Sequence, residues 1–148
     1  MKQFVILTLL ASTIAISSGC SKDDDNTPQQ SRTELITQSS WKFESASAQG
    51  QDVSALVDDC LKDNAFTLAT NGTGTIDEST EVCDPSTAGN FTWEFQSNET
   101  KLNVSTALFP GGSGLFDIVS INQNNLVVSQ EMTLPPFPAT TVQITLKH

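Results

Sequence analysis

The feature that most restricts the fold of this chain is a repeated alternation of apolar and polar residues. In the segment Phe91–Phe95, for example, Phe91, Trp93 and Phe95 alternate with polar side chains. A period of two is typical of a β-strand that buries one face. The same pattern recurs in about eight short segments, which are residues 41–43, 66–68, 75–76, 91–95, 102–104, 116–118, 126–128 and 142–146.

Turn-forming residues separate these segments at short intervals. They are Asn71-Gly72, Asn98-Glu99, Pro110-Gly111-Gly112, Asn124-Asn125 and Pro135-Pro136. Consecutive strands joined by short turns predict an antiparallel meander. An eight-stranded meander with one apolar face closes most economically into an up-and-down β-barrel, and a β-sandwich is the alternative.

The turn at Asn71-Gly72 also predicts the register of one hairpin. A two-residue turn there would set Ile76 opposite Thr67 and expose a large apolar side chain. A three-residue turn sets Ile76 opposite Phe66, so that both lie on one face. We prefer the second register, because a slip of one residue moves every side chain to the other face of the sheet.

Residues 1–19 have the composition of a signal peptide. Lys2 supplies a positive charge, and the largely apolar segment Phe4–Ile16 follows it. This segment is shorter than the roughly 20 residues that a helix needs to span a bilayer. It therefore predicts an export signal that is removed from the mature protein.

The sequence around Cys20 resembles the lipobox of bacterial lipoproteins, although Ser17 stands where that pattern usually has Leu. The resemblance implies that Cys20 carries palmitate or similar acyl chains and anchors the protein in the outer membrane. Residues 20–32 then form a lipidated cysteine and a flexible acidic linker, and residues 33–148 form the folded domain, with Thr33 capping a short first helix. The run Ser21–Asp25 resembles the export signal of surface-exposed lipoproteins and implies a position at the cell surface.

Two cysteines remain once Cys20 is assigned to the lipid. Exported proteins meet an oxidising compartment, where paired cysteines form disulfides. We therefore predict one disulfide between Cys60 and Cys83. Closing a loop of this length contributes about 3 kcal/mol to stability.

The charge of the chain restricts its partners. There are 17 Asp and Glu residues against 7 Lys and Arg residues. A surface of this sign repels phosphate backbones, so nucleic-acid binding is not expected.

The segment Asp58–Asn64, followed by Cys83-Asp84-Pro85, resembles the lipocalin-like domain of many bacterial lipoproteins. The entry into the Trp41 strand and the Trp93 strand match as well, and the resemblance covers about residues 34–147. Ser39 departs from it, since lipocalins have Gly in the Gly-x-Trp entry. The resemblance implies an eight-stranded barrel that binds a small apolar molecule non-covalently.

No group of residues predicts catalysis, and no cofactor or metal is expected. The single histidine, His148, is the last residue and is expected to be frayed, so a Ser/His/Asp arrangement has no base. The acidic residues near the cysteines lack the spacing of an EF-hand and are typical of solvated loops. We therefore predict that the protein is not an enzyme.

The expected ligand site is the aromatic and aliphatic inner face of the barrel. Its predicted lining residues are Trp41, Phe43, Phe66, Leu68, Phe91, Trp93, Phe95 and Phe116. The loops at residues 109–114 and 134–138 either line the barrel mouth or serve as turns. The sequence thus predicts a monomeric, membrane-anchored binding protein for a small hydrophobic ligand. The alternative is a structural or protein-interaction module whose barrel core is filled by these same side chains.

Overall fold

The computed structural model describes residues 29–135 and 138–148. The predicted signal peptide (residues 1–19), the predicted lipid-bearing Cys20 and residues 21–28 of the predicted linker lie outside the described residues. Within the described part of the chain, no helix is both long and apolar enough to cross a bilayer.

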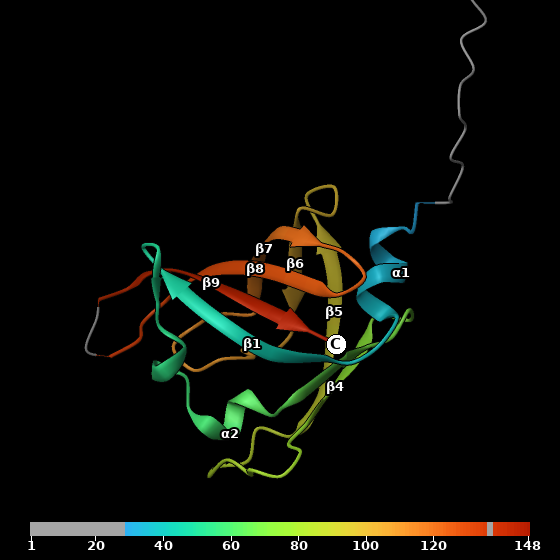
Figure 1. The fold of residues 1–148 in the computed structure, drawn as a ribbon. Helices are drawn as coiled ribbons and strands as arrows, with labels where there is room; N and C mark the ends of the chain where they lie inside the picture. The colour runs from blue at the N-terminus through green and yellow to red at the C-terminus, as the bar shows by residue number, and fades with distance from the viewer. Residues whose placement is uncertain (1–28, 136–137) are drawn as a thin grey trace, which may run out of the picture.

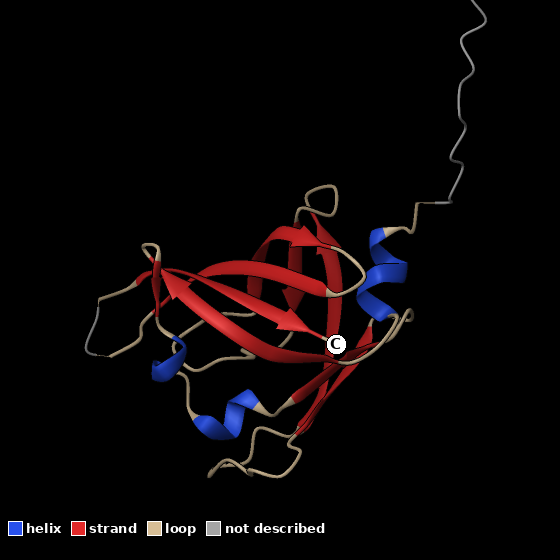
Figure 2. Ribbon diagram, in the orientation of Figure 1, coloured by secondary structure: helices blue, strands red, loops and turns tan. Residues whose placement is uncertain are grey.

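The described chain forms an antiparallel β-barrel, as predicted (Figures 1 and 2). Eight strands follow one another around the wall, and β1 pairs with β9 to close it. The wall strands are β1 (Trp41–Ala48), β3 (Ala65–Leu68), β4 (Thr73–Asp77), β5 (Gly89–Gln96), β6 (Lys101–Val104), β7 (Leu115–Ile121), β8 (Asn125–Met132) and β9 (Thr140–Lys147). A ninth strand, β2 (Gln51–Asp52), pairs only with the end of β1.

The β3–β4 hairpin has the predicted register. Phe66 lies opposite Ile76, and Leu68 lies opposite Gly74. Gly72 has a φ of 81°, a left-handed conformation that glycine adopts without steric cost. The turn therefore places all the large apolar residues of both strands on the inner face.

One end of the barrel is closed by α1 (Arg32–Thr37). Ile36 and Trp41 are both fully buried there, and the Trp41 indole Nε1 donates a hydrogen bond to the Ile36 carbonyl at 2.9 Å. The helix is capped by Ser31 rather than by Thr33, because Ser31 and Glu34 form a reciprocal capping box.

The C-terminal residue packs against this closed end, so the expectation of a frayed His148 is wrong. Its ring lies 3.7 Å from the Trp41 ring, measured between centroids. Its Nδ1 lies 2.9 Å from the carbonyl oxygen of Ser40. The exposed ring is held by these contacts because β9 runs beside β1 and ends next to the first residues of that strand.

The opposite end carries the longer connections. The β1–β3 connection contains β2, a short 3₁₀ helix η1 (Ser54–Leu56) and α2 (Asp59–Lys62). None of these three elements was predicted. The β4–β5, β6–β7 and β8–β9 loops lie at the same end, which we call the mouth.

Candidate functional site

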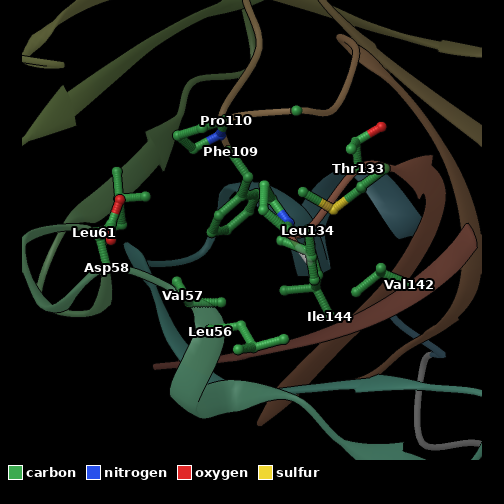
Figure 3. A pocket seen from close by; sticks show the side chains of 13 residues that line it. Leu56, Val57, Asp58, Leu61, Phe109, Pro110, Thr133, Leu134, Val142 and Ile144 are labelled. Carbon is green, nitrogen blue, oxygen red and sulfur yellow. The ribbon is translucent and has the colours of Figure 1, made fainter. Parts of the chain in front are cut away.

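A cavity of about 500 Å³ opens at the mouth of the barrel (Figure 3). Its walls come from η1, α2, the β6–β7 loop, the end of β8 with the loop that follows, and β9. Most of its lining side chains are apolar. The lining residues are Leu56, Val57, Asp58, Leu61, Phe109, Pro110, Gly111, Met132, Thr133, Leu134, Pro135, Val142 and Ile144.

The cavity exists because β1 and β3 separate toward the mouth. They pair only at Trp41 with Phe66 and at Lys42 with Ala65, near the closed end. Beyond these pairs β1 continues along β9 and, at its end, along the short β2, and the β1–β3 connection has to cover the gap to β3. That connection is irregular, so it covers the opening without filling it.

Hydrogen bonds to Ala46 fix the position of η1 beside this opening. The Val53 amide donates to the Ala46 carbonyl at 2.9 Å, and the Ala46 amide donates to the Ser54 hydroxyl at 2.9 Å. Asp52 accepts a further hydrogen bond from the Ser54 amide at 2.8 Å. These hydrogen bonds direct Leu56 and the adjacent Val57 to the cavity wall.

Phe109 separates the cavity from the core of the barrel. It belongs to the β6–β7 loop, yet only 2% of its surface is exposed. Its ring lies 5.7 Å from the Phe66 ring and 6.4 Å from the Phe43 ring, between centroids. The same residue lines the cavity, so it forms the cavity floor and the top layer of the core.

The loop that carries Phe109 is fastened to β8. The buried side chain of Gln130 accepts a hydrogen bond from the Ser113 amide at 2.7 Å, and the Thr133 amide donates to the Gly111 carbonyl at 3.1 Å. Gly111 has a φ of 78°, and a Cβ there would collide with the Thr133 carbonyl oxygen. Only glycine fits this close approach, which sets the position of the loop over the barrel.

A disulfide holds the other side of the mouth, as predicted. Cys60 in α2 and Cys83 in the β4–β5 loop are bonded, with their Cα atoms 5.2 Å apart. The bond ties α2, which supplies Leu61 to the cavity wall, to a loop 23 residues further along the chain. The two segments therefore stay together at the mouth.

Two carboxylates order the same β4–β5 loop. Glu78 is buried and accepts hydrogen bonds from Ser86, Thr87 and the Cys83 amide. These hydrogen bonds, with that from the Ser86 hydroxyl the most important, lower the pKa of Glu78 to about 2. Hydrogen bonds from the backbone amides of Glu81 and Thr80 likewise lower the pKa of Asp63.

The polar lining of the cavity is sparse. Among the described residues that line it, Asp58 is the only charged one, and its exposed side chain lies at one edge, next to Leu61 (Figure 3). Although Asp58 is the N-cap of α2, its side chain makes no capping hydrogen bond. Among residues 29–135 and 138–148, no group of three or more His, Cys, Asp or Glu side chains is arranged to hold a metal ion.

The eight residues predicted to line a ligand pocket lie elsewhere, in the interior. All eight pack in or against one hydrophobic core, and none of them is among the residues that line the mouth cavity. Seven of them are buried, and Phe95 is half-buried in edge-to-face contact with Trp93. The side chains that the sequence assigned to a pocket thus form part of the hydrophobic core of the barrel.

The residues that do line the cavity were only partly visible in the sequence. The expectation that residues 109–114 and 134–138 line the mouth was one of two alternatives, and Phe109, Gly111 and Leu134 do so. Leu56, Val57 and Leu61 were missed. Their segment has no clear period, and the one signal that could have placed it at the mouth is the predicted disulfide beside Leu61.

Comparison with known proteins gives one family match. The family model described as "Lipocalin-like domain" matches residues 38–128. A solved structure of Japanin from Rhipicephalus appendiculatus, bound to cholesterol, is similar with a TM-score of 0.45 and 13% sequence identity, over 76% of each chain. No curated protein matches the chain.

Proposed function

The chain belongs to the lipocalin-like domain family, and from that premise we propose that it binds a small hydrophobic molecule non-covalently in its mouth cavity. The observation that carries the proposal is the cavity itself, about 500 Å³ in volume and bordered mostly by apolar side chains. Pockets for small molecules are typically about 300–1,000 Å³ and have a few polar groups among apolar walls. The cavity fits both descriptions.

Packing and a covalent bond hold the walls of the cavity in place. Its floor, Phe109, is packed on the core, and its side wall is held by the disulfide of α2. A site whose walls are already in place does not have to order them when the ligand binds, which favours affinity. Buried apolar residues such as Leu134 and Ile144 border the cavity, so an apolar ligand would displace water from their surfaces.

The alternative is a structural or protein-interaction module with a filled barrel core. The eight residues predicted to line a pocket pack in or against one hydrophobic core, which is what this alternative expects. The apolar cavity at the mouth, however, has the volume of a small-molecule pocket, and a filled core alone does not account for it. We therefore favour ligand binding and treat the alternative as an outcome of the test.

We further propose that Cys20 anchors the protein in the outer membrane, facing outward from the cell. The first described residues lie at the closed end of the barrel. There Arg32 donates to the Glu99 carbonyl at 2.6 Å, and Gln30 accepts from Gln123 at 2.9 Å. A tether that joins the domain at this end leaves the mouth on the far side, open to the medium.

Blocking the cavity tests the proposed function. Thr133 is exposed at the cavity edge, so Thr133→Trp would place an indole across the opening at little cost to folding. Thr141 is also exposed but points away from the cavity on β9, so Thr141→Trp is the matched control. Each protein is titrated calorimetrically with a panel of neutral lipids and detergents below their micelle concentrations.

We expect the wild-type protein and Thr141→Trp to bind a member of the panel. We expect the affinity of Thr133→Trp for the same molecule to be at least about tenfold lower. A tenfold loss corresponds to about 1.4 kcal/mol, less than the burial of one large apolar side chain. If no member of the panel binds the wild-type protein, the binding function is wrong and the interaction module takes its place. If Thr133→Trp binds as well as the wild-type protein, the ligand does not enter the mouth cavity.

A further inference from the structure

The acidic residues of this protein are concentrated at the mouth. Three segments at that end, which are residues 49–64, residues 77–88, and the described part of residues 131–140 (131–135 and 138–140), hold nine acidic residues and one basic residue, a net side-chain charge of −8. The rest of the described chain holds five acidic and four basic residues, a net side-chain charge of −1. The mouth therefore carries most of the net negative charge of the described chain.

The single basic residue among these segments does not offset the charge at the cavity. Lys62 lies on α2, and its Nζ lies 2.7 Å from an Asp59 carboxylate oxygen. That pair leaves Asp58, the neighbour of Asp59, as an exposed carboxylate on the cavity wall. Within the described part of the chain, Asp58 has no ion-pair partner.

The position of Asp58 is unusual for an aspartate that precedes a helix. At an N-cap the carboxylate normally accepts a hydrogen bond from the first turn, which stabilises the helix. Here it does not, and the side chain instead borders an apolar cavity. An unengaged carboxylate at the edge of an apolar site is suited to hold the polar end of a ligand.

Resting on the proposed function, we infer that the ligand is a cationic amphiphile, a molecule with an apolar chain and an ammonium or guanidinium head. The apolar chain of the ligand occupies the mouth cavity between Phe109, Leu134 and Ile144. The head lies at the rim beside the Asp58 carboxylate. The surrounding negative charge attracts the cation as it approaches, because the fields of neighbouring carboxylates add.

The same charges exclude other amphiphiles with similar chains. A fatty acid or another anionic lipid would place its head in a region of −8 net side-chain charge, with no free basic side chain in the three mouth segments to receive it. Like charges that face one another at short range oppose binding. A neutral amphiphile is tolerated, but it gains nothing from Asp58.

Three probes with the same twelve-carbon chain separate these cases. They are dodecyltrimethylammonium, dodecyl maltoside and laurate, each titrated calorimetrically below its micelle concentration. At low salt the cation is expected to bind the wild-type protein at least about fivefold more tightly than the neutral probe, the ratio that an exposed ion pair of about 1 kcal/mol produces. Laurate is expected to bind more weakly than both, and 0.5 M NaCl is expected to reduce the differences.

Two variants locate the effect. Asp58→Asn is expected to lose most of the preference for the cation, measured as the ratio of the affinities of this variant for the cationic and the neutral probe. Asp77→Asn removes the same charge from an exposed position on β4 that does not line the cavity, and it is expected to change the preference less than twofold.

The outcomes distinguish this inference from the proposed function. Equal binding of the cationic and neutral probes, or tighter binding of laurate, overturns the inference and leaves the binding function in place. A preference that persists in Asp58→Asn overturns the role of Asp58. Failure of all three probes to bind the wild-type protein removes both the inference and the proposed function.

Discussion

Truncating Phe66 tests whether the barrel interior is filled, as the structure indicates. Only 1% of the Phe66 surface is exposed, so Phe66→Ala would leave a cavity in a packed region. Replacing a buried aromatic residue by alanine lowers the free energy of unfolding by about 3–5 kcal/mol. Phe66 also contacts Phe109 with ring centroids 5.7 Å apart, a geometry worth about 0.5–1.5 kcal/mol beyond burial. We therefore expect Phe66→Ala to lower the free energy of unfolding by about 4 kcal/mol.

Leu56 provides the comparison at the mouth. Its side chain is 38% exposed and borders the existing cavity, so its removal creates little new empty space. Complete burial of a leucine contributes about 1.5–3 kcal/mol, and a partly exposed one contributes less. Leu56→Ala is expected to cost about 1 kcal/mol.

Urea denaturation followed by far-UV circular dichroism measures both variants. With a slope of about 2 kcal/mol per M, a loss of about 4 kcal/mol lowers the midpoint by about 2 M, and Leu56→Ala lowers it by about 0.5 M. The refuting result is a cost for Phe66→Ala no larger than that for Leu56→Ala. It would mean that Phe66 borders empty space, as the sequence-based pocket prediction supposed.

Three further predictions concern the loop, the disulfide and the anchor. Because the folded pKa of Glu78, about 2, lies below the ordinary 4.5, its ionised form stabilises the fold above pH 4.5, and this contribution is lost as the pH falls toward 2. Thermal melts of Glu78→Gln should therefore depend less on pH in that window than those of the wild-type protein, and equal dependence would contradict the assignment. Replacing Cys60 and Cys83 together by serine should lower the free energy of unfolding by about 3 kcal/mol in urea titrations, and an unchanged midpoint would count against a stabilising bond. Cys20→Ser should move the protein from the membrane to the soluble fraction on cell fractionation, and continued retention in membranes would exclude this anchor.

The sequence predicted the barrel wall well, because the wall depends on local rules. The alternation assigns each residue to one face of the sheet, and the turn at Gly72 determines which residues of β3 and β4 lie opposite each other. The pairing of Phe66 with Ile76 therefore follows from a few residues. The disulfide between Cys60 and Cys83 followed from counting cysteines. None of these inferences needs knowledge of how distant loops fold.

The position of the cavity could not be predicted in the same way. The alternation predicts that Phe43 and Phe66 point inward, but it does not predict whether another side chain packs over them at the mouth. The residue that does so is Phe109, 43 positions after Phe66 in the chain and within a loop of no regular period. Its packing depends on the glycine contact at Gly111 and on Gln130, an inward-facing polar residue that strand patterns do not explain.

The closed end shows the same division between local and long-range information. The short helix before Trp41 was expected from its local sequence, and the structure differs only in which residue caps it. The contact between Trp41 and His148 joins residues near the two ends of the folded chain. It follows from closure of the barrel between β1 and β9, which makes the last residue a neighbour of the first strand.

Methyl NMR during titration with dodecyltrimethylammonium shows whether the ligand enters the mouth cavity or the barrel core. The methyl resonances of Leu56, Leu134 and Ile144, which line the cavity, are expected to shift in proportion to the bound fraction. Those of Leu102 and Val104, which are buried in the core away from the cavity lining, should stay in place. Shifts centred on Leu102 and Val104, with the mouth methyls unchanged, would mean that the ligand enters the core and not the mouth cavity.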